Sequence, residues 1–190
     1  MNGSEKDLSG KVSLLILLAG FNGSGKTTLA KKLEKDLQIN IVSGDPLRLL
    51  LKNEILYYQD FDISIPTEKG RTTREIVRNY RNQVTKTLLG AGQSVIYDSS
   101  NMKKEHRKKV FSEIRNEIDS VKRIIVHVTL PEEKLLERLE ERPEENWAKH
   151  HKIYNKPAFE IPTLDEADII FEYNQENYEE IKNAIAEFLD

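Results

Sequence analysis

Apolar residues along this chain occur in short continuous runs, and longer stretches of helical periodicity separate these runs. Continuous apolar runs of four to eight residues are typical of strands that are covered on both faces of a sheet. Four runs have this length, at residues 13–19, 94–97, 123–130 and 169–173, and a shorter one lies at 40–42. The pattern therefore predicts five strands, each followed by a helical segment.

The segments between these runs repeat apolar residues every three or four positions, as amphipathic helices do. Leu29, Leu33 and Leu37 form such a stripe in a helix expected over residues 26–37. The other helices are expected from Pro46 onward and over residues 72–89, 103–118, 131–142 and 178–189. In the helix over 72–89, the stripe expected to face the sheet consists of Ile76, Val77, Tyr80, Val84 and Leu88.

Regular alternation of strands and helices predicts an α/β fold, a three-layer αβα sandwich around a parallel five-stranded sheet. The 190 residues suit a single domain, 1–190. Residues 1–11 are expected to form a loose lead-in, and residues 142–162 a small lid or connector. Ligands of such folds bind at the carboxyl ends of the strands, where we expect the site.

Composition narrows the classes of function. The chain has no cysteine, which excludes disulfides, a thiolate nucleophile and a cysteine zinc site. Its net charge of −3 does not indicate a nucleic-acid binder of basic type. The longest apolar run, Leu14–Ala19, is too short to cross a membrane, and the polar start does not fit a secretory signal. We therefore expect a cytoplasmic protein without a membrane partner.

A glycine-rich turn follows the first predicted strand and has the spacing G-x-x-x-x-G-K-[ST]. Glycines at this spacing allow backbone N–H groups to surround phosphate oxygens, and the following helix directs its positive end at them. The pattern predicts a binding site for ATP and Mg²⁺, in which Lys26 reaches the β- and γ-phosphates and the Thr27 hydroxyl binds the metal. The expected nucleotide-binding residues are Gly20, Asn22, Gly23, Ser24, Gly25, Lys26, Thr27 and Thr28.

Asp45 follows the second predicted strand, and Arg48 lies one helical turn later. A carboxylate at this edge can orient an attacking hydroxyl and accept its proton, which makes Asp45 a candidate catalytic base. Arg48 would lie on the same helix face and is a candidate ligand for an anionic group of the acceptor. Asp45 also suits the N-cap of the next helix, and the two roles are compatible.

Asp98 ends the third predicted strand and is the candidate second metal ligand beside Thr27. Asn101 is expected either to cap the next helix or to contact the acceptor. A basic run, Lys103–Lys109, follows, and most of it is expected to form a solvated helix face. Only Arg107 of this run is a candidate acceptor-binding residue.

Arg138 and Arg142 lie four residues apart, so they share one face of the predicted helix. Two such guanidinium groups can stabilise charge that develops during phosphoryl transfer, and both are candidate catalytic residues. The alternative is ion pairing with the glutamates around them, Glu137, Glu140, Glu141, Glu144 and Glu145.

Together, these features resemble P-loop kinases of the polynucleotide 5′-hydroxyl kinase and zeta-toxin-like group. The matching residues are Gly20–Thr28, Asp45 with Arg48, Asp98–Asn101 with Arg107, and Arg138 with Arg142. The resemblance implies a P-loop NTPase fold with a helical lid and an ATP-dependent phosphotransferase that acts on an alcohol group. It implies Asp45 as base, Arg48 as the arginine for an acceptor phosphate, and Arg138 and Arg142 as lid arginines.

The acceptor and the oligomeric state stay open at this point. A polynucleotide 5′-hydroxyl and an anionic small molecule both fit the expected kinase. A nucleoside monophosphate kinase or a shikimate-type kinase is an alternative, since the spacing of Asp45 and Arg48 suits these families too. The third hypothesis is a regulatory switch that binds and slowly hydrolyses a nucleoside triphosphate. The sequence lacks the guanine-reading motif N-K-x-D of many such switches.

Overall fold

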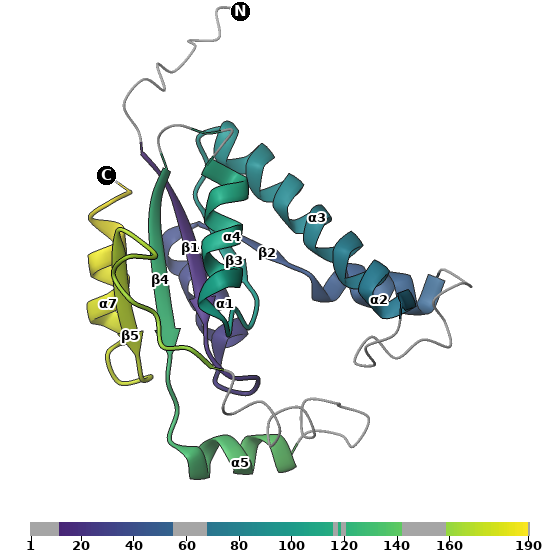
Figure 1. The fold of residues 1–190 in the computed structure, drawn as a ribbon. Helices are drawn as coiled ribbons and strands as arrows, with labels where there is room; N and C mark the ends of the chain where they lie inside the picture. Colours follow the sequence, from purple (N-terminus) through teal and green to yellow (C-terminus); the bar gives the residue numbers. More distant parts are fainter. Residues whose placement is uncertain (1–11, 55–67, 116–117, 119–120, 142–158, 190) are drawn as a thin grey trace, which may run out of the picture.

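The computed structural model describes residues 12–54, 68–115, 118, 121–141 and 159–189. Its centre is a five-stranded sheet in the order β2-β3-β1-β4-β5 (Figure 1). All four strand pairs are parallel. The strands are β1 (Ser13–Ala19), β2 (Asn40–Ser43), β3 (Val95–Asp98), β4 (Val121–Val128) and β5 (Ile169–Tyr173). The predicted α/β fold with a parallel five-stranded sheet is therefore confirmed.

Helices cover both faces of the sheet and make the fold three-layered. The described helices are α1 (Lys26–Leu37), α2 (Asp45–Glu54), α3 (Glu68–Gly90), α4 (Lys104–Arg115), α5 (Glu132–Glu140) and α7 (Tyr178–Ala186). One core contains Leu14, Ile16 and Leu18 of β1, together with apolar residues of α1 and α7. The other contains Leu15, Leu17 and Ala19, together with apolar residues of α3 and α4. Because side chains alternate along a strand, β1 supplies both cores and is buried throughout.

Most element boundaries lie within a few residues of the predicted ones, but helix α3 differs in two respects. It begins at Glu68, four residues before the predicted start, and its predicted apolar stripe is wrong in part. Ile76 and Tyr80 are exposed, whereas the buried face includes Thr73, Arg81, Asn82 and Thr85. The proposed lead-in 1–11 and residues 142–158 of the proposed lid lie outside the described residues.

The carboxyl ends of the strands meet at one edge of the sheet, and connections to the helices leave it there (Figure 1). The loop after β1 leads into α1, β2 leads into α2, and β3 leads toward α4. Helix α5 follows β4 at this edge. Parallel topology therefore brings together motifs that lie far apart in the sequence.

Candidate functional site

The loop between β1 and α1 has the backbone geometry of a phosphate cradle. Gly25 is the N-cap of α1 and has φ 103°, a conformation that L-residues with a side chain rarely adopt. A Cβ atom at Gly25 would lie 3.4 Å from Nη1 of Arg138, so a side chain there would also occupy the space beside this guanidinium. The loop therefore places backbone N–H groups and the N-terminus of α1 where an anion can bind.

Lys26 is the first residue of α1, and its side chain crosses the loop. Its ammonium group donates hydrogen bonds to the carbonyl oxygens of Gly20, at 3.0 Å, and of Phe21, at 2.7 Å. These contacts hold a buried positive charge inside the loop. An ammonium group in this position can contact phosphate oxygens bound to the surrounding N–H groups.

The two candidate metal ligands are in direct contact. The Thr27 hydroxyl donates a hydrogen bond to Oδ2 of Asp98 at 2.8 Å, although 71 residues separate them. Burial raises the pKa of Asp98, whereas the Thr27 hydroxyl and the charge of Lys26 act in the opposite direction. A hydroxyl and a carboxylate oxygen suit Mg²⁺, which binds few protein oxygens and completes its shell with phosphate and water. Thr27 and Asp98 thus fit as the residues that would hold this ion.

Asp45 and Arg48 lie beside Asp98, at the neighbouring strand end. Ser43, the last residue of β2, pairs in register with Asp98, and Asp45 comes two residues later. The Asp45 side chain is 77% exposed and accepts a hydrogen bond from Nη1 of Arg48, whose side chain is 33% exposed. Helix α2 begins at Asp45, one residue before the prediction, and the Arg48 N–H donates to the Gly44 carbonyl. Asp45 is therefore the first helical residue, and its carboxylate faces solvent.

Arg138 on α5 lies over the phosphate loop from the other side. Its guanidinium lies next to Gly25 and also contacts Gln175. Nη2 of Arg138 donates to the side-chain oxygen of Gln175 at 2.9 Å, in the Gln175 amide orientation that directs this oxygen at the guanidinium. Gln175 itself has φ 79°, which is uncommon for a residue other than glycine. No carboxylate of the described residues pairs with Arg138. Arg142, the second predicted lid arginine, lies outside the described residues.

Comparison with protein-family models identifies the family of this chain. Residues 15–154 match a family model described as an AAA domain. The chain belongs to this AAA-domain family. No curated protein sequence matches it.

Several solved structures share the fold of this AAA-domain protein at low sequence identity. A protein from Chloroflexus aurantiacus aligns with a TM-score of 0.72 at 17% identity, over 95% of this chain and 100% of that one. The APS kinase CysC of Mycobacterium tuberculosis, solved with AMPPNP and APS, gives 0.62 at 17% identity, over 94% and 98%. Kti12 of Chaetomium thermophilum, solved with ADP-AlF3, gives 0.62 at 20% identity, over 93% and 99%.

Two predicted acceptor-binding residues have structural contacts instead. Arg107 is 0% exposed and donates two hydrogen bonds to Glu166, from Nε at 2.7 Å and from Nη2 at 3.0 Å. Its Nη1 donates to the carbonyl oxygens of Asn101 and Met102. A guanidinium enclosed in this way cannot reach a ligand, so the predicted acceptor contact of Arg107 is wrong. Arg107 fixes the loop after β3.

Asn101 is also buried, at 7% exposed, and its side-chain amide donates to the Leu18 carbonyl at 2.8 Å. Its φ of 43° is left-handed, which Asn tolerates better than most residues. Helix α4 begins at Lys104, so Asn101 does not cap it. The structure therefore assigns Asn101 to the junction of β1 with the loop after β3, and neither predicted role is supported.

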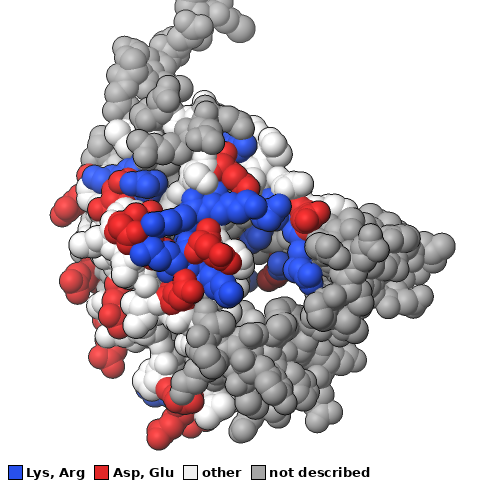
Figure 2. Space-filling view, viewed as in Figure 1, with Lys and Arg blue, Asp and Glu red and all other residues white. Residues whose placement is uncertain are grey.

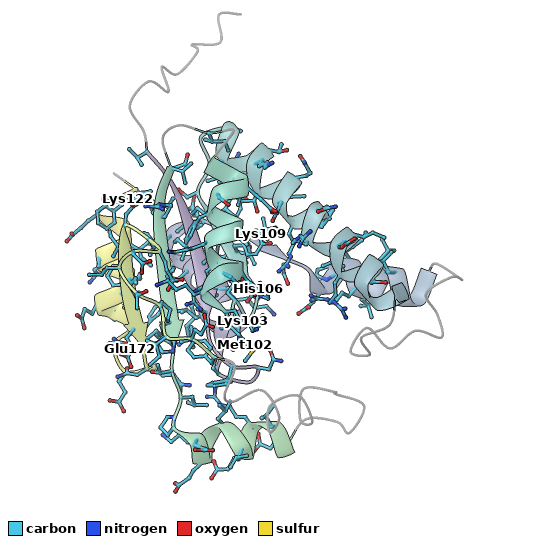
Figure 3. The ribbon with its side chains drawn as sticks, in the orientation of Figure 1. Met102, Lys103, His106, Lys109, Lys122 and Glu172 are labelled. Carbon is cyan, nitrogen blue, oxygen red and sulfur yellow. The ribbon has the colours of Figure 1, made fainter. Side chains whose placement is uncertain are left out.

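The basic run before and within α4 is largely compensated by acidic residues. Lys104 and Lys108 both bind Asp165, at 2.8 and 2.6 Å, and Lys109 pairs with Glu113. Lys103, His106 and Lys109 are exposed and lie along one side of the chain from the loop into α4 (Figure 3). Positive and negative side chains are interleaved over this face of the AAA-domain protein (Figure 2). The expectation of a solvated helix face holds for these residues.

One residue of the site was missed by sequence reasoning. Arg81 of α3 is buried, its guanidinium lies over the Tyr97 ring at 4.7 Å, and it interacts electrostatically with Asp45 and Asp98. Arg81 follows Val77 by four residues and precedes Val84 by three, so the sequence contained a signal. A charged residue within an apolar stripe is a candidate for function.

Proposed function

We propose that this AAA-domain protein is an ATP- and Mg²⁺-dependent kinase that transfers the γ-phosphoryl group to a hydroxyl acceptor. The observation that carries the proposal is the pair of carboxylates at neighbouring strand ends. Asp98 is buried against Thr27, whereas Asp45 is exposed and free of the phosphate loop. The buried Asp98 suits the role of a metal ligand, and the exposed Asp45 suits the role of a base that contacts an acceptor arriving from solution.

The described residues provide the other groups that phosphoryl transfer needs. Backbone N–H groups of the loop and the Lys26 ammonium would hold the phosphates, and bound Mg²⁺ would neutralise part of their charge. Asp45 would orient the acceptor hydroxyl and accept its proton as the new O–P bond forms and the bond to ADP breaks. Arg138, above Gly25, would donate hydrogen bonds to the oxygens that gain charge. Arg142, which lies outside the described residues, is proposed to share this role.

Similar folds support the nucleotide part of the proposal. The Mycobacterium protein was solved with AMPPNP and the Chaetomium protein with ADP-AlF3, and each covers nearly the whole of this chain. Their identities are too low to transfer an acceptor. The choice of acceptor must therefore rest on this chain's own residues.

The charge pattern of α4 favours a small acceptor over a polynucleotide. A groove for nucleic acid needs cationic side chains that are free to meet successive phosphates. Two of the lysines in the basic run bind Asp165 and a third pairs with Glu113, and Arg107 is buried. We therefore place a small hydroxyl compound first and a polynucleotide 5′-hydroxyl second.

Two variants separate nucleotide binding from transfer. In Lys26→Ala, we expect affinity for a fluorescent ATP analogue to fall at least about tenfold, because a charged contact to phosphate is lost. In Asp45→Asn, we expect unchanged ATP affinity and a loss of transfer of about 100-fold or more from γ-labelled ATP. Unchanged ATP affinity in Lys26→Ala would refute the nucleotide site.

The acceptor assay uses a 5′-hydroxyl oligonucleotide, nucleoside monophosphates, shikimate and small hydroxy acids or sugar phosphates in parallel. Label on one class, lost in Asp45→Asn, identifies the acceptor and supports Asp45 as the base. Full transfer by Asp45→Asn would remove the base from the mechanism. Slow hydrolysis without transfer to any member of the panel would favour the switch hypothesis.

A further inference from the structure

Arg81 is a buried charged residue whose hydrogen-bonding capacity is largely unused. It is 8% exposed, and its Nε and Nη1 atoms have no hydrogen-bond partner in the part of the chain that the structure describes. Leaving guanidinium donors unpaired and out of water is costly, and such groups call for a specific explanation. Burial also lowers the pKa of Arg81, which reflects the same unfavourable enclosure of its charge.

The contact with Tyr97 does not satisfy these donors. The guanidinium lies 4.7 Å from the ring centroid, which is a cation–π distance. A cation–π contact uses the flat face of the guanidinium, whereas its N–H bonds point outward within the plane. The Tyr97 hydroxyl donates to Asn82 at 2.9 Å. Stacking therefore fixes the orientation of Arg81 and leaves its N–H groups available.

Arg48 and Arg81 both lie against Gly44. A Cβ atom at Gly44 would lie 3.3 Å from Nη1 of Arg48, 3.4 Å from Cδ of Arg81 and only 2.6 Å from Cγ1 of Val77. The missing side chain thus allows α3 to pack on the end of β2, with Arg48 and Arg81 both next to this glycine. Two adjacent positive charges repel each other, and the charge of Arg48 further disfavours the charged form of Arg81.

The nearby acids offset only part of this charge: Asp45 and Asp98 attract Arg81 electrostatically, but their hydrogen bonds go to other residues. Asp45 bonds to Arg48, and Asp98 bonds to Thr27. Arg78, one turn before Arg81 on α3, adds a further buried Nε without a partner among the described residues. Excess positive charge therefore lies next to the candidate base, at the carboxyl edge of the sheet.

We propose that Arg81 is a second anion-binding residue, which joins the predicted acceptor arginine Arg48 in binding a phosphate, sulfate or carboxylate group of the acceptor while the acceptor hydroxyl meets Asp45. This proposal rests on the proposed kinase function and specifies its substrate class as a small hydroxyl compound with a separate anionic group. The planar fork of arginine matches the oxygens of such groups. An anion here would pair the free donors of Arg81 and relieve the repulsion between the two arginines.

The first experiment measures the anion site without requiring turnover. Protein saturated with AMPPNP and Mg²⁺, so that the phosphate loop is filled, is dialysed to equilibrium against radiolabelled sulfate. We expect saturable binding in the wild type and affinity at least about tenfold lower in Arg81→Met, since charged hydrogen bonds are lost. Arg74→Met, an exposed position on the same helix, removes the same charge and should bind like the wild type.

Equal sulfate affinity in Arg81→Met and the wild type would overturn the proposal, as would an equal loss in Arg74→Met. Arg81→Lys keeps the positive charge but removes the planar guanidinium group. It replaces Arg81→Met in the sulfate-binding experiment if Arg81→Met does not fold. We expect intermediate sulfate affinity from Arg81→Lys, and wild-type affinity would contradict bidentate recognition by Arg81.

The second experiment compares acceptors that differ only in the anionic group, such as glycerol with glycerol 3-phosphate and ribose with ribose 5-phosphate. We expect the anionic member of an accepted pair to be phosphorylated at least about tenfold faster, and this preference to disappear in Arg81→Met. Transfer to neutral members at equal rates in both proteins would overturn the inference and leave the kinase proposal standing. Sulfate binding that depends on Arg81, without transfer to any acceptor, would support the anion site and count against the kinase.

Discussion

Helices α1 and α3 cover opposite faces of one sheet, yet they bury very different side chains. Beyond the phosphate-loop lysine, α1 buries Leu29, Ala30 and Leu33. Helix α3 buries Val77 and Leu89 but also four polar residues, Thr73, Arg81, Asn82 and Thr85. The first helix follows the usual rule of an apolar inner stripe, and the second departs from it.

The difference separates a face that serves mainly for stability from one that also builds the site. Apolar burial stabilises in proportion to area, whereas a buried polar group costs free energy unless it is paired. Asn82 is paired, because it accepts from the Tyr97 hydroxyl and donates to Glu113 at 2.6 Å. Arg81 and Thr85 have buried donor atoms without partners among the described residues. We therefore expect substitutions on the two faces to separate stability from function.

The largest effect is expected on the α3–α4 face, at Arg107. Arg107→Met leaves the Glu166 carboxylate buried without its partner, which should lower the free energy of unfolding by about 3–5 kcal/mol. Urea unfolding followed by circular dichroism measures this change. The double variant Arg107→Met/Glu166→Leu removes both charges and should recover much of the lost free energy of unfolding. A loss below about 1 kcal/mol in the single variant would contradict a closely coupled ion pair.

On the α1 face, Leu33→Ala should lower the free energy of unfolding by about 2–5 kcal/mol, because it leaves a cavity in a fully buried cluster. ATP affinity per folded molecule should stay unchanged, since Leu33 lies two turns beyond the phosphate loop. Urea unfolding and binding of a fluorescent ATP analogue check the two statements. If the variant is fully folded under the assay conditions and still binds ATP more weakly, this face is not purely structural.

Arg81→Met should move stability and function in opposite directions. The Nε and Nη1 atoms of this enclosed charge have no hydrogen-bond partner among the described residues, so its removal should raise the free energy of unfolding by about 1 kcal/mol. Phosphoryl transfer to an anionic acceptor should fall at the same time. Thermal unfolding and the transfer assay on one preparation test the pair of outcomes. Destabilisation together with lost transfer would indicate that Arg81 mainly supports the fold.

The smallest effect is expected at Thr85, whose buried hydroxyl has no partner among the described residues. Thr85→Val keeps the shape of the side chain and removes the hydroxyl, so it should raise the free energy of unfolding by about 1 kcal/mol. Transfer should be unaffected, in contrast to Arg81→Met. A destabilised Thr85→Val would mean that the hydroxyl binds a buried water, which would remove Thr85 from the set of unpaired groups.

Sequence reasoning succeeded where local pattern and burial agree. Strand β1, helix α1 and strand β5 have the predicted boundaries, because continuous apolar runs and an apolar stripe define them. It failed on α3, where Ile76 and Tyr80 were placed inward and Arg81 was overlooked. Periodicity assumes that apolar residues face inward, and a functional face violates this assumption.

The same limit applies to the candidate site. The contact of Thr27 with Asp98 follows from motif order and parallel topology, so it was predictable. The enclosure of Arg107 depends on Glu166, which comes 59 residues later and carries no motif. A basic residue in a charged run therefore gives no local sign that it is buried.

The central position of β1 also has a consequence for how this chain folds during synthesis. The most apolar strand is made first, but its neighbours β3 and β4 end at Asp98 and Val128. Until those residues have left the ribosome, the edges of β1 have no native partner, because β2 pairs only with β3. Residues 13–19 thus depend on partners that emerge late, and we expect the nascent chain to be most open to aggregation and to chaperone binding during this interval.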